Sequence, residues 1–188
     1  MTGKIYQIHI SLKGSQPKIW RRILVKPDIT LVDFHRIIQT VMGWTNSHLH
    51  QFEKGLVSYA PEEFEVEDAR NSRTVRLNSL LKKEKDKIKY EYDFGDGWLH
   101  DIVLEKLLPL DKSMQIPGCI AGKGNCPPED CGGIWGYTNL KNIISNPKHK
   151  EYEDMMAWLG GEFDPDYFDM KDINEMLKYP NYGCIWIE

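Results

Sequence analysis

The chain lacks any stretch typical of a secretory signal or a membrane anchor. Its first ten residues, MTGKIYQIHI, do not place a charged segment before an apolar one. No apolar run approaches the ~20 residues that a membrane-spanning helix needs. We therefore expect a cytoplasmic protein that does not associate with membranes. In a reducing compartment Cys119, Cys126, Cys131 and Cys184 are expected to be free thiols, and a disulfide framework is disfavoured.

The sequence also lacks the excess of positive charge that nucleic-acid binding requires. Lysine and arginine number 24 against 28 acidic residues, which gives a net charge of −4. Helix-turn-helix, RRM and zinc-finger signatures are absent, as are the G-x-S-x-G motif and the phosphate-binding loop motif. Nucleic acid is therefore not an expected partner, and no catalytic residue is assigned.

Aromatic and aliphatic residues are abundant enough to form one large core. The chain has 188 residues, 41% of them hydrophobic, with six Trp, nine Tyr and six Phe. KIYQIHISL and IWRRILV alternate as two strands, and TLVDFHRIIQTVMGW repeats apolar residues at helical spacing between a Thr30 cap and Gly43. Strand patterns dominate to about residue 108, and helical patterns follow. This order predicts an α+β fold with a ββα start, a mainly antiparallel twisted sheet with helices packed on one side, and one domain over 1–188.

The clearest hairpin is KIKYEYDFGDGWLHDIVLEKL. A three-residue loop, Gly95-Asp96-Gly97, would pair Phe94 with Trp98 and Tyr92 with His100, and it would collect one continuous apolar face. We therefore predict that register.

The stretch GCIAGKGNCPPEDCGG, residues 118–133, raises the question of what orders so irregular a loop. Its thiols are spaced C-x6-C-x4-C, which departs from the paired Cys-x-x-Cys pattern of structural zinc sites. Packing of small buried groups is the favoured interpretation. The alternative is a zinc site, whose candidate ligands are Cys119, Cys126, Cys131, His48, His50 and His100.

Four carboxylate side chains form a second candidate site. Asp93 and Asp96 flank the hairpin tip, and Glu129 and Asp130 follow the two prolines. If the two loops meet, these groups and a histidine would suit a divalent metal or acid–base chemistry. Ordinary turn and capping roles are the favoured interpretation.

Arg21 and Arg22 point to opposite faces of one strand. The inward arginine is expected to pair with an acid of residues 151–188, with a ligand clamp as the alternative.

Four segments carry a resemblance to a known family: PKIWRRILV, the helix ending in MGW followed by HLHQF, YEYDFGDGWLHDIVLE, and CPPEDCGGIWGY. In this order they resemble the plasmid pRiA ORF-3-like family over roughly residues 4–180. The resemblance implies a single α+β domain without an established biochemical function. Some relatives are described as resolvases, but the Tyr-x-Arg-x-Ser pattern of serine resolvases is missing here.

Three functional hypotheses follow. The leading one is a non-enzymatic interaction module without a cofactor, which binds an unidentified protein partner through the 90–100 hairpin and the 118–136 loop. Its expected binding residues are Trp98, Asp96, Glu129, Asp130, Trp135 and Arg21. The second is a metal-dependent hydrolase or nuclease that uses His48, His50, His100 and nearby acids. The third is a nucleic-acid-associated accessory protein of mobile elements, which the net charge disfavours.

Overall fold

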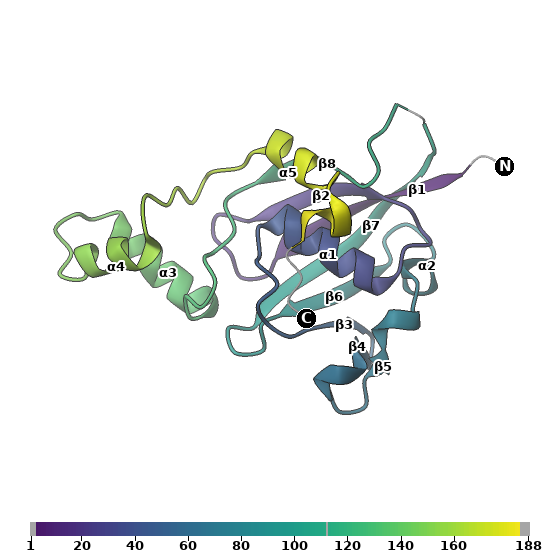
Figure 1. Ribbon diagram of the computed structural model, residues 1–188, viewed down its shortest axis with the longest axis horizontal. Helices are drawn as coiled ribbons and strands as arrows, with labels where there is room; N and C mark the ends of the chain where they lie inside the picture. The colour runs from purple at the N-terminus through teal and green to yellow at the C-terminus, as the bar shows by residue number, and fades with distance from the viewer. Residues whose placement is uncertain (1–2, 112, 185–188) are drawn as a thin grey trace.

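The computed structural model describes residues 3–111 and 113–184, and it is built around one eight-stranded sheet (Figure 1). The strands are β1 (Lys4–Leu12), β2 (Trp20–Val25), β3 (His50–Lys54), β4 (Val57–Ala60), β5 (Arg70–Asn71), β6 (Lys87–Tyr92), β7 (Trp98–Pro109) and β8 (Gly118–Lys123). Their order is β5-β4-β3-β6-β7-β1-β2-β8, and every pair is antiparallel except β4 with β5. The predicted single-domain α+β fold with a mainly antiparallel sheet is confirmed.

The helices are α1 (Leu31–Met42), α2 (Leu77–Leu80), α3 (Gly133–Ile144), α4 (Tyr152–Leu159) and α5 (Met170–Met176), with short 3-10 turns η1 (Glu62–Phe64), η2 (Ser72–Thr74) and η3 (Pro180–Gly183). Helix α1 follows β2 and completes the ββα start. It begins where the Thr30 hydroxyl accepts the Asp33 N–H, and it ends at Gly43, whose φ of 100° is left-handed. Helices α3 and α4 form a pair beyond one end of the sheet (Figure 1).

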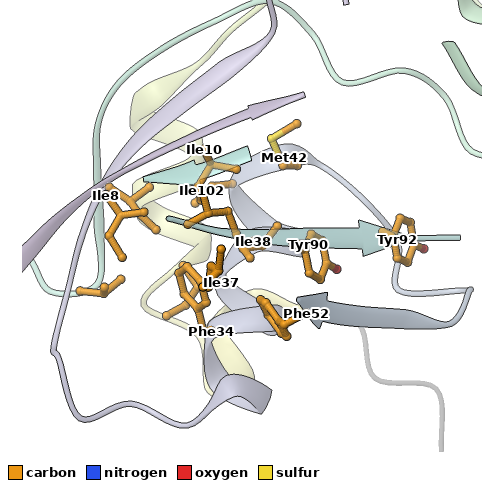
Figure 2. Packing of buried hydrophobic residues seen from close by; sticks show 14 of the residues in the cluster. Ile8, Ile10, Phe34, Ile37, Ile38, Met42, Phe52, Tyr90, Tyr92 and Ile102 are labelled. Carbon is orange, nitrogen blue, oxygen red and sulfur yellow. The ribbon is translucent and has the colours of Figure 1, made fainter. Parts of the chain in front are cut away.

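The core lies between α1 and the sheet face that it covers (Figure 2). Phe34 and Ile38 of α1 are fully buried, and they face Ile8, Ile102 and Tyr90 from three different strands. Burying an aliphatic or aromatic side chain contributes about 1.5–3 kcal/mol. This layer therefore fixes how α1 sits on the sheet.

The hairpin register differs from the one predicted. Tyr92 pairs with Trp98 rather than His100, and Tyr90 pairs with His100. The loop spans five residues because Asp93 takes a left-handed φ of 57° and leaves the strand early. The pairing is shifted by two residues, an even number, so the same strand side chains still face the core, except Phe94, which now lies in the loop and is 39% exposed.

Two helices begin elsewhere than their sequence patterns indicate. Helix α3 begins at Gly133 rather than after Thr138, and Gly132 precedes it with a φ of 87°. The last helix is capped by Asp169, which accepts the N–H groups of Lys171 and Asp172, rather than by Asp164.

The outer edge of the sheet at β8 is covered by α5. The Asn174 side chain accepts the N–H of Cys119 at 2.8 Å and donates to the carbonyl of the same residue at 2.8 Å. Both backbone groups of Cys119 are therefore satisfied by one amide.

Candidate metal centre

Three segments far apart in the sequence bring a histidine and three carboxylates together. His48 lies just before β3, Asp93 follows β6, and Glu129 and Asp130 lie in the loop between β8 and α3. The Nε2 atom of His48 is 3.1 Å from Asp130 Oδ1, and it is 3.7 Å from both Asp93 Oδ2 and Glu129 Oε2. The hairpin tip and the CPPED loop therefore meet, and His48 lies between them, in contact with carboxylates of both.

Asp93 is held in place by the turn that it starts. Its Oδ1 accepts the N–H of Gly95 at 2.9 Å and that of Asp96 at 3.3 Å. Its backbone carbonyl accepts the Gly97 N–H at 2.6 Å. The side chain is only 9% exposed, and the remaining oxygen, Oδ2, is the one that faces His48. The turn thus leaves one lone carboxylate oxygen for the site.

Glu129 is oriented just as firmly. Its Oε1 accepts the backbone N–H of Thr45 at 2.7 Å, the Thr45 hydroxyl at 2.9 Å and the Tyr92 hydroxyl at 3.1 Å. Burial raises the pKa of Tyr92, and the negative charge of Glu129 raises it further, so this phenol stays protonated as a donor. Glu129 Oε2 is buried without a hydrogen-bond partner, as is His48 Nε2.

The charges of this group do not balance internally. A single imidazole, even when protonated, offsets one of the three carboxylates. Candidate ligand atoms of His48, Asp93 and Asp130 lie within 4.8 Å of one another, and these three are the only such group found in residues 3–111 and 113–184. At ligand distances of about 2.0–2.2 Å, tetrahedral zinc holds its donors about 3.3–3.6 Å apart. The distances from His48 Nε2 to Asp130 and Asp93, 3.1 and 3.7 Å, are close to this spacing, and the two carboxylates would have to approach each other to complete the coordination.

Five of the six predicted zinc ligands lie outside this group. Cys119 and Cys126 are buried, and desolvation raises the pKa of both thiols. Cys131 is also a free thiol, with a pKa raised to about 12, mainly by burial. None of these sulfurs belongs to a three-ligand group within the described part of the chain. Of the six, only His48 is part of the candidate centre.

The other two histidines are packed in the core side of the sheet. The ring of His50 stacks on His35 with centroids 3.5 Å apart and planes 7° apart. His100 is buried beside Tyr90 and Trp44, and desolvation lowers its pKa to about 4. Neither ring joins His48 at the carboxylates.

Two residues of the predicted binding surface are not on the surface. Trp98 is fully buried, with its ring 5.3 Å from that of Trp44. Arg21 is 2% exposed and forms no ion pair with an acid of residues 3–111 or 113–184. Its guanidinium donates to the carbonyls of Trp20, Val41, Lys123 and Gly124. For the described residues 151–184 the expectation of an acid partner was wrong, because Arg21 donates to four backbone carbonyls instead.

Arg21 nevertheless connects two segments near the site by hydrogen bonds. It joins the end of α1, at Val41, to Gly124 at the start of the loop that carries Glu129. The outward arginine, Arg22, forms an ion pair with Glu105 at 2.6 Å.

Asp96 and Trp135 occupy the junction of the two loops. Asp96 Oδ2 accepts the N–H of Gly132 at 3.1 Å, which ties the hairpin tip to the start of α3. The Trp135 side chain, in the first turn of α3, is 88% exposed.

A buried polar network beside the site escaped the sequence analysis. His35 Nε2 lies 2.8 Å from the Asn46 side-chain oxygen, which can only accept, so His35 Nδ1 accepts from the Tyr90 hydroxyl at 2.9 Å. Gln39 donates to the same hydroxyl. Both His35 and Gln39 fall within the apolar repeat of α1. Polar residues at such positions were the sequence feature that could have indicated a buried hydrogen-bond network.

Fold and site together define a single-domain α+β protein with a histidine–carboxylate cluster where two loops meet at one end of its sheet. The chain belongs to the plasmid pRiA4b ORF-3-like family, which it matches over residues 4–172. The two relatives described in the next paragraph have no established biochemical function. None of the described helices of this chain has the length and apolar character to cross a membrane.

Two relatives illustrate the family. The uncharacterized protein y4hQ of Sinorhizobium fredii is 33% identical over 180 residues, which cover 94% of this chain and 92% of that protein. The crystal structure of a protein of unknown function, MM3350 from Methanosarcina mazei Go1, is similar with a TM-score of 0.83 and 38% identity. That match covers 92% of this chain and 98% of the other.

Proposed function

We propose that His48, Asp93 and Asp130 bind one divalent transition-metal ion, zinc being the first choice, and that the centre serves a metal-dependent hydrolase. The observation that carries the proposal is the convergence of three carboxylates on His48 Nε2, with that nitrogen and Glu129 Oε2 both buried and without a hydrogen bond. Imidazole favours zinc over magnesium or calcium, and three protein ligands are typical of catalytic zinc.

Glu129 has the geometry of a general base. Three donors fix its Oε1, so its Oε2 is held toward the centre without a competing bond. A bound divalent ion supplies Lewis acidity and lowers the pKa of water toward neutrality. With such an ion bound by His48, Asp93 and Asp130, Glu129 Oε2 would act as the base that accepts a proton from water.

The first test is metal binding. Purified without a metal-binding tag, the protein is titrated with zinc against a chromophoric chelator. We expect about one equivalent per chain, and at least a tenfold loss of affinity in His48→Gln, since loss of a ligand exceeds the 10–100-fold effects of outer-shell changes. His149→Gln, a histidine of the α3–α4 connection, is the matched control. Absence of stoichiometric zinc, or equal affinity in His48→Gln, overturns the metal centre.

The second test separates binding from chemistry. Hydrolysis of p-nitrophenyl acetate and of bis(p-nitrophenyl) phosphate is measured with zinc-loaded and zinc-free protein. Glu129→Gln is expected to lower kcat by 10²–10⁴-fold, the usual contribution of a general base, while zinc stoichiometry is unchanged. Zinc binding without zinc-dependent turnover of either probe contradicts the hydrolase assignment.

A second candidate function is protein binding through α3. The indole of Trp135 is 88% exposed on a helix pair that extends beyond the sheet, and exposed Trp is enriched among interface anchors (Figure 1). A photo-crosslinking amino acid placed at position 135 should yield one defined adduct in cells, whereas the same residue at Lys150 should not. Equal labelling from both positions argues against an interface.

A further inference from the structure

A cavity of about 400 Å³ opens beside the candidate centre and shares His48 and Asp93 with it. It lies between the start of α1, the segment 46–50, the 3-10 turn η1 and the hairpin tip. Cavities of about 300–1,000 Å³ are the size used for small-molecule ligands. A ligand in this cavity would therefore reach the centre from one side.

The walls of the cavity are largely apolar. They are formed by Val32, Leu49, Pro61, Phe64 and Phe94. Phe64 meets the His50 ring edge-on at 5.2 Å, and Phe94 is 39% exposed at the hairpin tip. Such walls suit a flat ring, because aromatic side chains bind rings by stacking and edge contacts.

The imidazoles of His35 and His50 belong to the polar part of the lining, whose other members are Asn46, Ser47, His48, Glu63, Arg73 and Asp93. Burial lowers the pKa of His35 to about 3, so this ring carries no charge at neutral pH, and the His50 ring stacks on it with centroids 3.5 Å apart. Both nitrogens of His35 are engaged, by Tyr90 and Asn46. The Nδ1 of His50 is buried with no hydrogen-bond partner. His35 therefore contributes an uncharged ring with no free nitrogen to the lining.

Charge in and around the cavity disfavours anions. Among the described residues that line it, the only Lys or Arg is Arg73, and its guanidinium is already paired with Glu63. The three carboxylates at the centre exceed the charge of a divalent ion by one unit. Phosphate groups are usually held by free Lys or Arg, which makes a nuclease the poorer form of the hydrolase hypothesis.

We infer that the cavity binds a neutral aryl carbonyl compound, an aromatic amide or ester, with its ring between Phe64 and Phe94 and its carbonyl toward His48 and Asp93. The inference rests on the proposed function for the direction of the carbonyl. In the reaction, the oxygen of water bonds to the carbonyl carbon, and the bond from that carbon to the leaving nitrogen or oxygen breaks. Glu129 accepts a proton from the water and returns it to the leaving group.

The test compares ligands that differ in one feature. Zinc-loaded protein is titrated with benzohydroxamic acid and acetohydroxamic acid, which share a metal-binding group and differ by the ring. We expect the aromatic compound to bind at least tenfold more tightly, and Phe64→Ala to remove most of that preference. Tyr167→Ala, an exposed aromatic residue outside the cavity, is the matched control. Equal affinity of the two hydroxamates for zinc-loaded wild-type protein overturns the inference while leaving the metal centre intact.

A second arm does not depend on metal. Zinc-free protein is titrated with benzamide and with phenyl phosphate while aromatic resonances of His50 and Phe64 are followed by NMR. Benzamide should shift both residues, and phenyl phosphate should be at least tenfold weaker. Absent shifts with benzamide, or phenyl phosphate binding as well as benzamide, contradicts the neutral ligand class. A protein that binds benzamide but no zinc instead refutes the proposed function alone.

Discussion

Replacing Asp93 with Asn separates a metal centre from a plain ion pair. Asparagine tolerates the left-handed φ of 57°, and its amide oxygen can accept the N–H groups of Gly95 and Asp96 as the carboxylate does. The substitution therefore keeps the turn and removes one negative charge. Any change in metal affinity then reports the charge and the ligand atom rather than misfolding.

The expected sign in the absence of metal follows from the neighbouring carboxylates. Ligand atoms of Asp93 and Asp130 lie within 4.8 Å, where two like charges repel by about 1 kcal/mol at the dielectric constant of water and about 3.5 kcal/mol at an effective value of 20. Asp130 is 71% exposed, so the lower figure applies. Zinc-free Asp93→Asn should be as stable as the wild type or up to about 1 kcal/mol more stable.

The assay pairs two measurements at pH 8, where proton competition for the ligands is small. Zinc affinity of Asp93→Asn, measured by chelator competition, should fall at least tenfold, and urea unfolding of the zinc-free protein should show no loss of stability. Asp96→Asn removes a charge from the same hairpin tip outside the group of three ligands and should retain wild-type affinity. If Asp93→Asn instead loses more than about 1 kcal/mol without zinc and keeps its zinc affinity, the cluster is a structural ion pair.

Three further predictions concern the scaffold. Arg21→Met should lower the free energy of unfolding in urea by at least about 3 kcal/mol, because four carbonyls lose a charged donor worth about 1.5–3 kcal/mol each. Arg22 is half-exposed and ion-paired, so Arg22→Met should lower it by less than about 1 kcal/mol. In the folded protein, burial lowers the pKa of His35 to about 3 and that of His100 to about 4. Below pH 6.5 these two histidines therefore bind protons in the unfolded chain but not in the folded protein. Stability should therefore be full above pH 6.5 and fall by about 1.4 kcal/mol per pH unit per histidine on acidification toward pH 5, and a flat urea-unfolding profile between pH 7 and 5 would contradict this. Trp98→Ala should cost about 3–5 kcal/mol by the same assay, and a loss below 1 kcal/mol would show that the indole is not core.

The fold was largely predictable from sequence because its signals are local. The Thr30 cap, the apolar repeat of α1 and the Gly43 end act within one helix and were predicted correctly. The hairpin pairing was missed because alternation has a period of two, so a shift of two residues leaves the apolar face unchanged. The deciding feature was the left-handed Asp93, which the alternation of apolar residues does not encode.

The candidate site was predictable only in part. From the sequence, a carboxylate site was expected only if the hairpin tip and the CPPED loop meet, and ordinary turn roles were the favoured interpretation. Asp93 has both roles, because one of its oxygens is bonded within the turn and the other faces the site. His48, His50 and His100 could not be told apart by pattern. Only the tertiary structure shows that His48 precedes its strand and reaches the acids, whereas the other two point into the core.

The amide of Asn174 has a consequence for how molecules of this protein behave toward one another. By satisfying both the N–H and the carbonyl of Cys119, it occupies the hydrogen-bonding positions that an incoming strand would take at the edge of β8. Unpaired edges are templates for strand addition between chains, and proteins protect them with charges, bulges or covering segments. Here a single side chain on α5 does so at Cys119. Loss of that amide would leave the N–H and the carbonyl of Cys119 open to a strand of another chain, so resistance to self-association at this edge depends on the docking of α5.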